Sequence, residues 1–122
     1  MPIKIKFHKT ADNKTIAEIV DKCFVINETQ DAIDLMGDLV LNNCSRIIVN
    51  EKNLHPDFFR LKTGLAGEIL QKFSNYKVKL AIIGDFSKHK SKSLQDFIYE
   101  SNNRNVIVFV DSIDSALSVI EK

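Results

Sequence analysis

Three acidic residues of this chain each follow an apolar run that predicts a parallel strand: Glu51, Asp85 and Asp111. In open α/β sheets, ligands bind at the carboxyl ends of the parallel strands. Three carboxylates gathered there could hold Mg²⁺, which prefers oxygen ligands. The alternative is structural, since acids often end strands and cap the next helix, and Asp111 followed by Ser112 fits that pattern. The first reading predicts an enzyme and the second does not.

The segment Ser87–Ser93 is the only local run of charge in the sequence, with three lysines around His89. It leads into a predicted helix, so its basic side chains and the free N–H groups of the helix could converge on an anion. A solvated polar loop is the alternative. With the neighbouring loops, it forms a candidate binding surface for a partner or a ligand. The residues of that surface are Glu51, Phe58, Phe59, Arg60, Asp85, Ser87, His89, Ser91, Ser93 and Asp111.

Thr63 precedes Gly64 and Leu65 at the start of a predicted helix. A hydroxyl at a helix N-cap accepts a hydrogen bond from a free backbone N–H, and this role alone explains a threonine. The functional alternative is a phospho-switch, because a helix N-terminus favours the charge of a phosphate. Gly64 and Gly67 weaken that helix, and we expect close packing against a neighbour to explain them, with a ligand against the bare backbone as the alternative.

The remaining reactive side chains form no catalytic pattern. His8, His55 and His89 belong to different segments, and none stands in a Ser-His-Asp or Cys-His arrangement. Phe58 and Phe59 are adjacent on a predicted turn that starts at Pro56, so their rings face different ways. One of them is expected to cover a pocket or a subunit interface, which leaves a homodimer open.

Hydrophobic periodicity predicts a strand–strand–helix start followed by strand–helix alternation. Alternation along Ile3–His8 and the run Thr15–Val20 predict a hairpin around Ala11–Asn13. Cys23–Ile26 either extends that hairpin or forms a short strand of its own. The other predicted strands are Arg46–Asn50, Val78–Ile83 and Val106–Val110, and helices are predicted after Asn27, Thr63, Ser93 and Ser112, with capping pairs Asn27–Gln30 and Ser93–Asp96.

These elements predict one α/β domain over residues 1–122, with a mixed, mostly parallel sheet of about five strands and about four helices. The composition, 44% hydrophobic and 27% charged, is that of a globular protein. A net charge of +1 gives no support for nucleic-acid binding or an anionic membrane. Neither a signal peptide nor a membrane span is expected. Cys23 and Cys44 lie beside apolar residues, which predicts buried free thiols and a cytoplasmic location.

The segments Phe58–Phe73, Leu80–Ser87 and Ser93–Ser101 resemble a small bacterial family catalogued as domain of unknown function 4180. More distantly, the element order resembles the STAS domain of anti-sigma-factor antagonists. In that superfamily a Ser or Thr before Gly-Leu is phosphorylated by a partner kinase, and Thr63 fills the pattern. Lys62 and the long approach from Asn50 depart from it.

The sequence therefore predicts a non-enzymatic, cytoplasmic, STAS-like regulatory domain. It would engage a protein partner or a small anionic ligand at the carboxyl end of its strands, without a cofactor. The alternative is a carboxylate- or metal-dependent enzyme using Glu51, Asp85 and Asp111.

Overall fold

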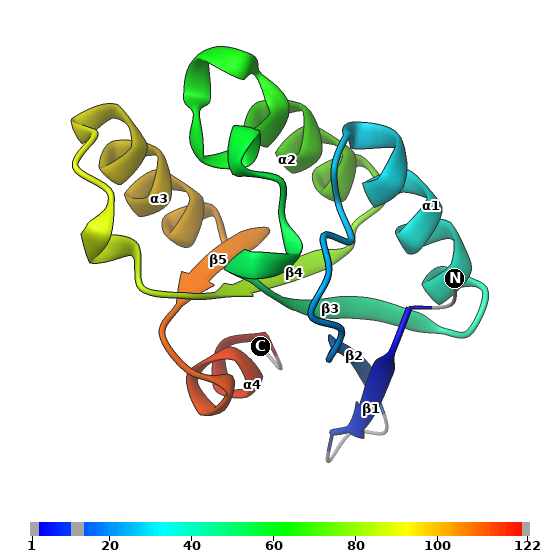
Figure 1. The fold of residues 1–122 in the computed structure, drawn as a ribbon. Helices are drawn as coiled ribbons and strands as arrows, with labels where there is room; N and C mark the ends of the chain where they lie inside the picture. Colours follow the sequence, from blue (N-terminus) through cyan, green and yellow to red (C-terminus); the bar gives the residue numbers. More distant parts are fainter. Residues whose placement is uncertain (1–2, 11–13, 121–122) are drawn as a thin grey trace.

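The protein is built on one five-stranded sheet whose strands lie side by side in chain order, β1-β2-β3-β4-β5 (Figure 1). The computed structural model describes residues 3–10 and 14–120. The first pair of strands is antiparallel and the other three pairs are parallel. The strands are β1 (Ile5–Lys9), β2 (Thr15–Ile19), β3 (Cys44–Asn50), β4 (Lys79–Ile83) and β5 (Ile107–Val110). The predicted mixed α/β sheet is confirmed.

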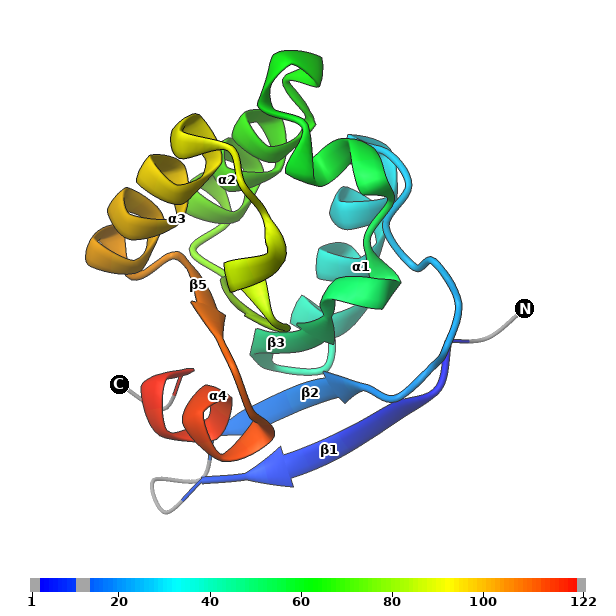
Figure 2. The same ribbon diagram turned by 60° about the vertical axis from the view of Figure 1, so that its left-hand side comes forward.

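In the described part of the chain, four α-helices cover the two faces of the sheet unequally. They are α1 (Thr29–Val40), α2 (Leu65–Asn75), α3 (Lys92–Arg104) and α4 (Ile113–Ile120). The first three lie over one face of the sheet and α4 lies alone against the other (Figures 1 and 2). Between β3 and α2 the chain forms 3₁₀ turns at Glu51–Asn53, Pro56–Phe59 and Leu61–Thr63. The second of these confirms the turn predicted to start at Pro56.

The core follows this layering. The main cluster takes alternate residues of the strands and the apolar stripes of α1, α2 and α3, including Ile47, Leu80 and Phe73, which are fully buried. A smaller cluster joins Ile48 and Ala81 to α4. On this face α4 packs mainly against β4 and β5.

Two helix starts differ from the sequence prediction by one or two residues. Helix α1 is capped by Glu28, which forms a reciprocal capping box with Asp31, instead of the predicted pair Asn27 and Gln30. Helix α3 begins at Lys92 because Ser91, not Ser93, accepts the hydrogen bond from Leu94 N at 3.2 Å. Each cap lies where the chain is still extended, which local sequence alone does not determine.

The start of α2 shows that the prediction of Thr63 as its N-cap is wrong. The N-cap is Gly64 in the left-handed region at φ 80°, a conformation that favours glycine. The Thr63 hydroxyl lies 2.8 Å from the carbonyl oxygens of both Asp57 and Arg60, to which it can donate, and it accepts from Leu65 N at 3.3 Å. A close approach does not explain Gly67, since a Cβ there would meet nothing within 4 Å.

The segment after β2 also differs from prediction. Cys23–Ile26 contains only an isolated bridge between Ile26 and Leu54, and Cys23 is exposed instead of buried. Cys44 is buried as expected. The predicted turn at Ala11–Asn13 lies outside the described residues. Within the part of the chain that the structure describes, no helix combines the length and the apolar character needed to cross a bilayer.

Candidate functional site

Asn53 joins the segment that follows β2 to the segment that follows β3. Its side chain is 0% exposed, and its Nδ2 donates to the carbonyl oxygens of Asp21 at 2.8 Å and Cys23 at 2.9 Å. Its Oδ1 accepts from Asn50 N at 2.9 Å, and its own carbonyl accepts from Val25 N at 2.7 Å. A buried side-chain amide whose N–H groups and oxygen all form hydrogen bonds holds its partners in a specific arrangement. The segments 19–25 and 50–54 therefore have a defined relative position.

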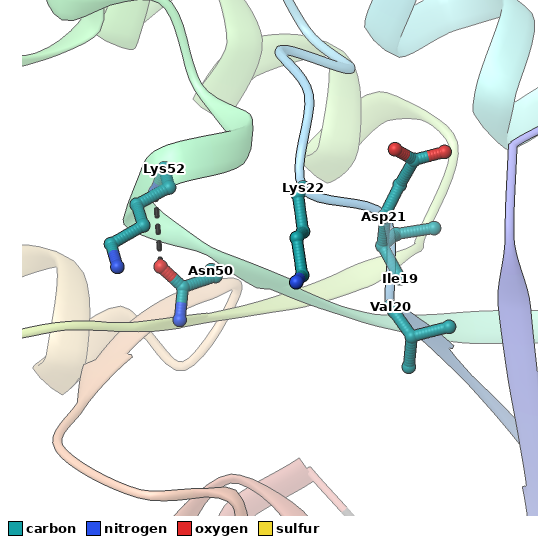
Figure 3. Close-up of a pocket in the computed structure, with 6 residues that line it drawn as sticks. All are labelled: Ile19, Val20, Asp21, Lys22, Asn50 and Lys52. Atoms are coloured by element: carbon teal, nitrogen blue, oxygen red, sulfur yellow. Dashed lines mark hydrogen bonds between the residues drawn. The ribbon is translucent and has the colours of Figure 1, made fainter.

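Between these two segments lies a pocket of about 540 Å³ at the carboxyl ends of β2 and β3 (Figure 3). The amino groups of Lys22 and Lys52 lie on either side of the Asn50 amide. Asn50 Oδ1 accepts from Lys52 N at 3.0 Å, which orients the amide so that its Nδ2 is left for the pocket. Neither lysine forms an ion pair with another described residue. Three nitrogen donors thus share one pocket.

Asp21 also lines this pocket, but its carboxylate is used elsewhere. It accepts from Cys23 N at 3.2 Å and from Lys4 N at 3.4 Å, and it points away from the Asn50 amide (Figure 3). Hydrogen bonds from Cys23 and from Lys4 hold the pKa of Asp21 below its ordinary value. The two lysines outnumber this one carboxylate, so the pocket carries a net positive charge.

A second, more open pocket of about 240 Å³ lies beyond Lys52, which lines both. Its apolar walls are Phe24, Leu54, Pro56 and Phe59, and its polar edge is Glu51, Lys88 and His89. Glu51 Oε1 accepts from Lys88 Nζ at 2.7 Å, and the Glu51 side chain is only 12% exposed. Gly84 permits this position, because a Cβ there would lie 2.7 Å from Glu51 Cδ.

Aromatic rings support the wall of this second pocket. Phe59 stacks on His89 with ring centroids 5.0 Å apart and planes 17° apart. Phe58, only 1% exposed, meets Phe59 edge to face at 5.1 Å, so Phe58 belongs to the core and Phe59 covers a pocket. The Nε2 atom of His89 is buried and has no hydrogen-bond partner among the described residues.

The other predicted site residues mostly stabilise their own loops. Asp85 Oδ1 accepts from the Ser87 hydroxyl at 2.6 Å and from Ser87 N at 3.2 Å, and these bonds lower the pKa of Asp85. Arg60 is exposed beside Asp57, with Nη1 and Oδ1 3.5 Å apart. Ser91 is a helix cap, whereas the side chain of Ser93 is exposed and has no hydrogen bond to another described residue.

The three carboxylates of the enzyme hypothesis have separate partners. Glu51 pairs with Lys88, Asp85 with Ser87, and Asp111 Oδ1 lies 3.3 Å from the Ser115 hydroxyl. Ser112 caps α4 as predicted, because its hydroxyl accepts from Ser115 N at 3.1 Å. Across residues 3–10 and 14–120, no three His, Cys, Asp or Glu side chains come together in a way that could hold a metal ion.

The sequence interpretation missed the residues that form the larger pocket, namely Lys22, Asn50, Lys52 and the buried Asn53. Asn50 ends a predicted strand, so the rule that selected the acids would also have selected it. Phe24 was placed in an apolar run, yet it is 53% exposed. Nothing in the local pattern distinguishes Lys22 or Lys52 from other surface lysines.

Comparison with known proteins identifies a family. Residues 11–120 match the family described as "Domain of unknown function (DUF4180)". No curated protein and no solved structure matches the chain.

Proposed function

The chain belongs to the DUF4180 family of unknown function, and we propose that it is a non-enzymatic domain that binds a small anionic ligand. The binding site is the pocket of Lys22, Asn50 and Lys52 at the carboxyl end of β2 and β3. The observation that carries the proposal is that three nitrogen donors, none with a partner among the described residues, line one pocket of about 540 Å³. Ligand pockets of proteins have volumes in this range.

The physical argument rests on charge and preorganisation. Two ammonium groups attract an anion, and hydrogen bonds to charged groups are stronger than neutral ones. Asn53 fixes the relative position of both walls before any ligand arrives, so little ordering is needed on binding. The absence of a nucleophile–base pair in the sequence is the reason to propose binding instead of catalysis.

A regulatory role extends this proposal. In this proposal a bound ligand alters the surface formed by segments 19–25 and 50–54, and a protein partner binds that altered surface. The STAS-like element order supports such a role by analogy only. An exposed free thiol at Cys23 fits a reducing, cytoplasmic compartment. Phosphorylation of Thr63 stays a separate prediction, tested by intact-mass measurement of protein from its native host.

The test is a titration of ¹⁵N-labelled protein with inorganic phosphate at low salt, followed by NMR. We expect the largest shifts at the backbone amides of Lys22 and Lys52 and at the side-chain amide of Asn50. Lys22→Ala and Lys52→Ala should each weaken binding about tenfold, since a charge-assisted hydrogen bond contributes roughly 1.5 kcal/mol. Added salt should weaken it further.

The matched control is Lys62→Ala, because Lys62 is an exposed lysine that lines neither pocket. Its affinity for phosphate should equal that of the unaltered protein. The proposal is wrong if millimolar phosphate shifts none of the three residues, or if Lys22→Ala and Lys52→Ala bind as well as the control.

A further inference from the structure

The two pockets at this end of the sheet share two wall segments, the one after β2 and the one after β3. The segment after β2 supplies Lys22 to the larger pocket and Phe24 to the smaller one. The segment after β3 supplies Asn50 to the larger pocket and Leu54 to the smaller, with Lys52 lining both. Because Asn53 ties these segments together, the pockets keep a constant relative position.

The aromatic walls of the smaller pocket favour the binding of a flat apolar group. Phe24 is 53% exposed, and its one ring contact among the described residues is a tilted one to His55 at 6.0 Å. Phe59 presents a ring whose position is fixed by stacking on His89 and by Phe86 at 6.1 Å. An exposed aromatic side chain beside a rigid aromatic wall favours a planar ring, which would bury both surfaces.

We propose that the ligand is an aromatic anion, whose charged group binds between Lys22 and Lys52 while its ring lies in the pocket of Phe24 and Phe59. This inference rests on the proposed function, because it assigns the anionic group to the same lysine pocket. The ion pair of Glu51 and Lys88 borders the ring subsite. It offers a carboxylate acceptor and an ammonium donor to polar substituents on the ring.

The test compares methyl phosphate, cyclohexyl phosphate and phenyl phosphate, three monoesters with the same charged group. Isothermal titration calorimetry at one pH and one ionic strength gives the three dissociation constants. We expect phenyl phosphate to bind about tenfold more tightly than methyl phosphate, equivalent to about 1.4 kcal/mol. Cyclohexyl phosphate should fall between them, because it buries apolar area without stacking.

Phe24→Ala should remove the advantage of phenyl phosphate and leave the affinity for methyl phosphate unchanged. Phe24 is largely exposed, so this variant keeps the fold. Lys52→Ala should weaken the binding of all three esters. Tyr99→Ala is the matched control, since Tyr99 is an aromatic residue that is 70% exposed and lines neither pocket.

The outcomes separate the two proposals. If methyl phosphate binds at the lysines but phenyl phosphate binds no more tightly, the aromatic subsite is wrong and the anion site stands. Equal affinities for phenyl and cyclohexyl phosphate would also refute an aromatic ring as the preferred group. If no ester binds, both proposals fail.

Discussion

The side-chain amide of Asn53 donates a hydrogen bond to the carbonyl oxygen of Asp21, 32 positions earlier in the chain, over 2.8 Å. This bond joins two loops that follow neighbouring parallel strands and carry the residues of both pockets. A single buried amide thus connects the stability of the fold to the shape of the candidate site.

The variant Asn53→Ala should lower the free energy of unfolding by about 3 kcal/mol, because it leaves the carbonyls of Asp21 and Cys23 and the N–H of Asn50 without partners. Urea denaturation followed by circular dichroism measures this change. Asn53→Asp keeps the acceptor and loses the donor, so it should also destabilise. Asn103→Ala, on an exposed part of α3, is the control and should change stability little.

Gly84→Ala should displace the Glu51 side chain, since the new Cβ would lie 2.7 Å from Glu51 Cδ. The displaced carboxylate loses its contact with Lys88, and we expect a cost of about 1 kcal/mol. In a Glu51→Ala background the clash is absent. There, Gly84→Ala should leave the free energy of unfolding unchanged or raise it by up to about 1 kcal/mol. Chemical denaturation of the four proteins forms a double-mutant cycle, and an additive result would contradict the contact.

Asp85 should titrate at a lower pH than an ordinary aspartate, because hydrogen bonds from Ser87 lower its pKa. A carboxyl group whose pKa is lowered by folding stabilises the protein above its unfolded pKa, near pH 4. That contribution is lost as the pH falls through the lower, folded pKa. Carboxyl ¹³C NMR of the protein measures the titration directly.

Ser87→Ala removes the hydroxyl that donates to Asp85 over 2.6 Å and should raise the pKa of Asp85 toward its ordinary value. Ser93→Ala is the matched control, since Ser93 is an exposed serine of the same region and forms no hydrogen bond with Asp85. An unchanged Asp85 titration in Ser87→Ala would show that the hydroxyl has no part in the shift.

Much of the fold could be predicted, because the spacing of apolar residues within each segment indicates whether it forms a strand or a helix. Alternation in Ile3–His8, the apolar run before Asn50 and the helical spacing after Thr63 each indicate one element, and strand–helix alternation implies the parallel sheet. The predictions of the first residue of each helix were less accurate. Gly64 and Ser91 are the caps because of backbone conformation at those residues, and neighbouring polar residues satisfy the same sequence rule.

The sequence by itself determined the elements, the sheet class and the end of the sheet where polar loops gather. Only the tertiary structure decided which side chains meet there. It separated Glu51, Asp85 and Asp111 among different partners and brought Lys22, Asn50 and Lys52 to one pocket. The reason is that β2 and β3 are neighbours although α1 lies between them in the chain, and the buried Asn53 joins the loops that follow them. Such long-range contacts leave no period in a local sequence.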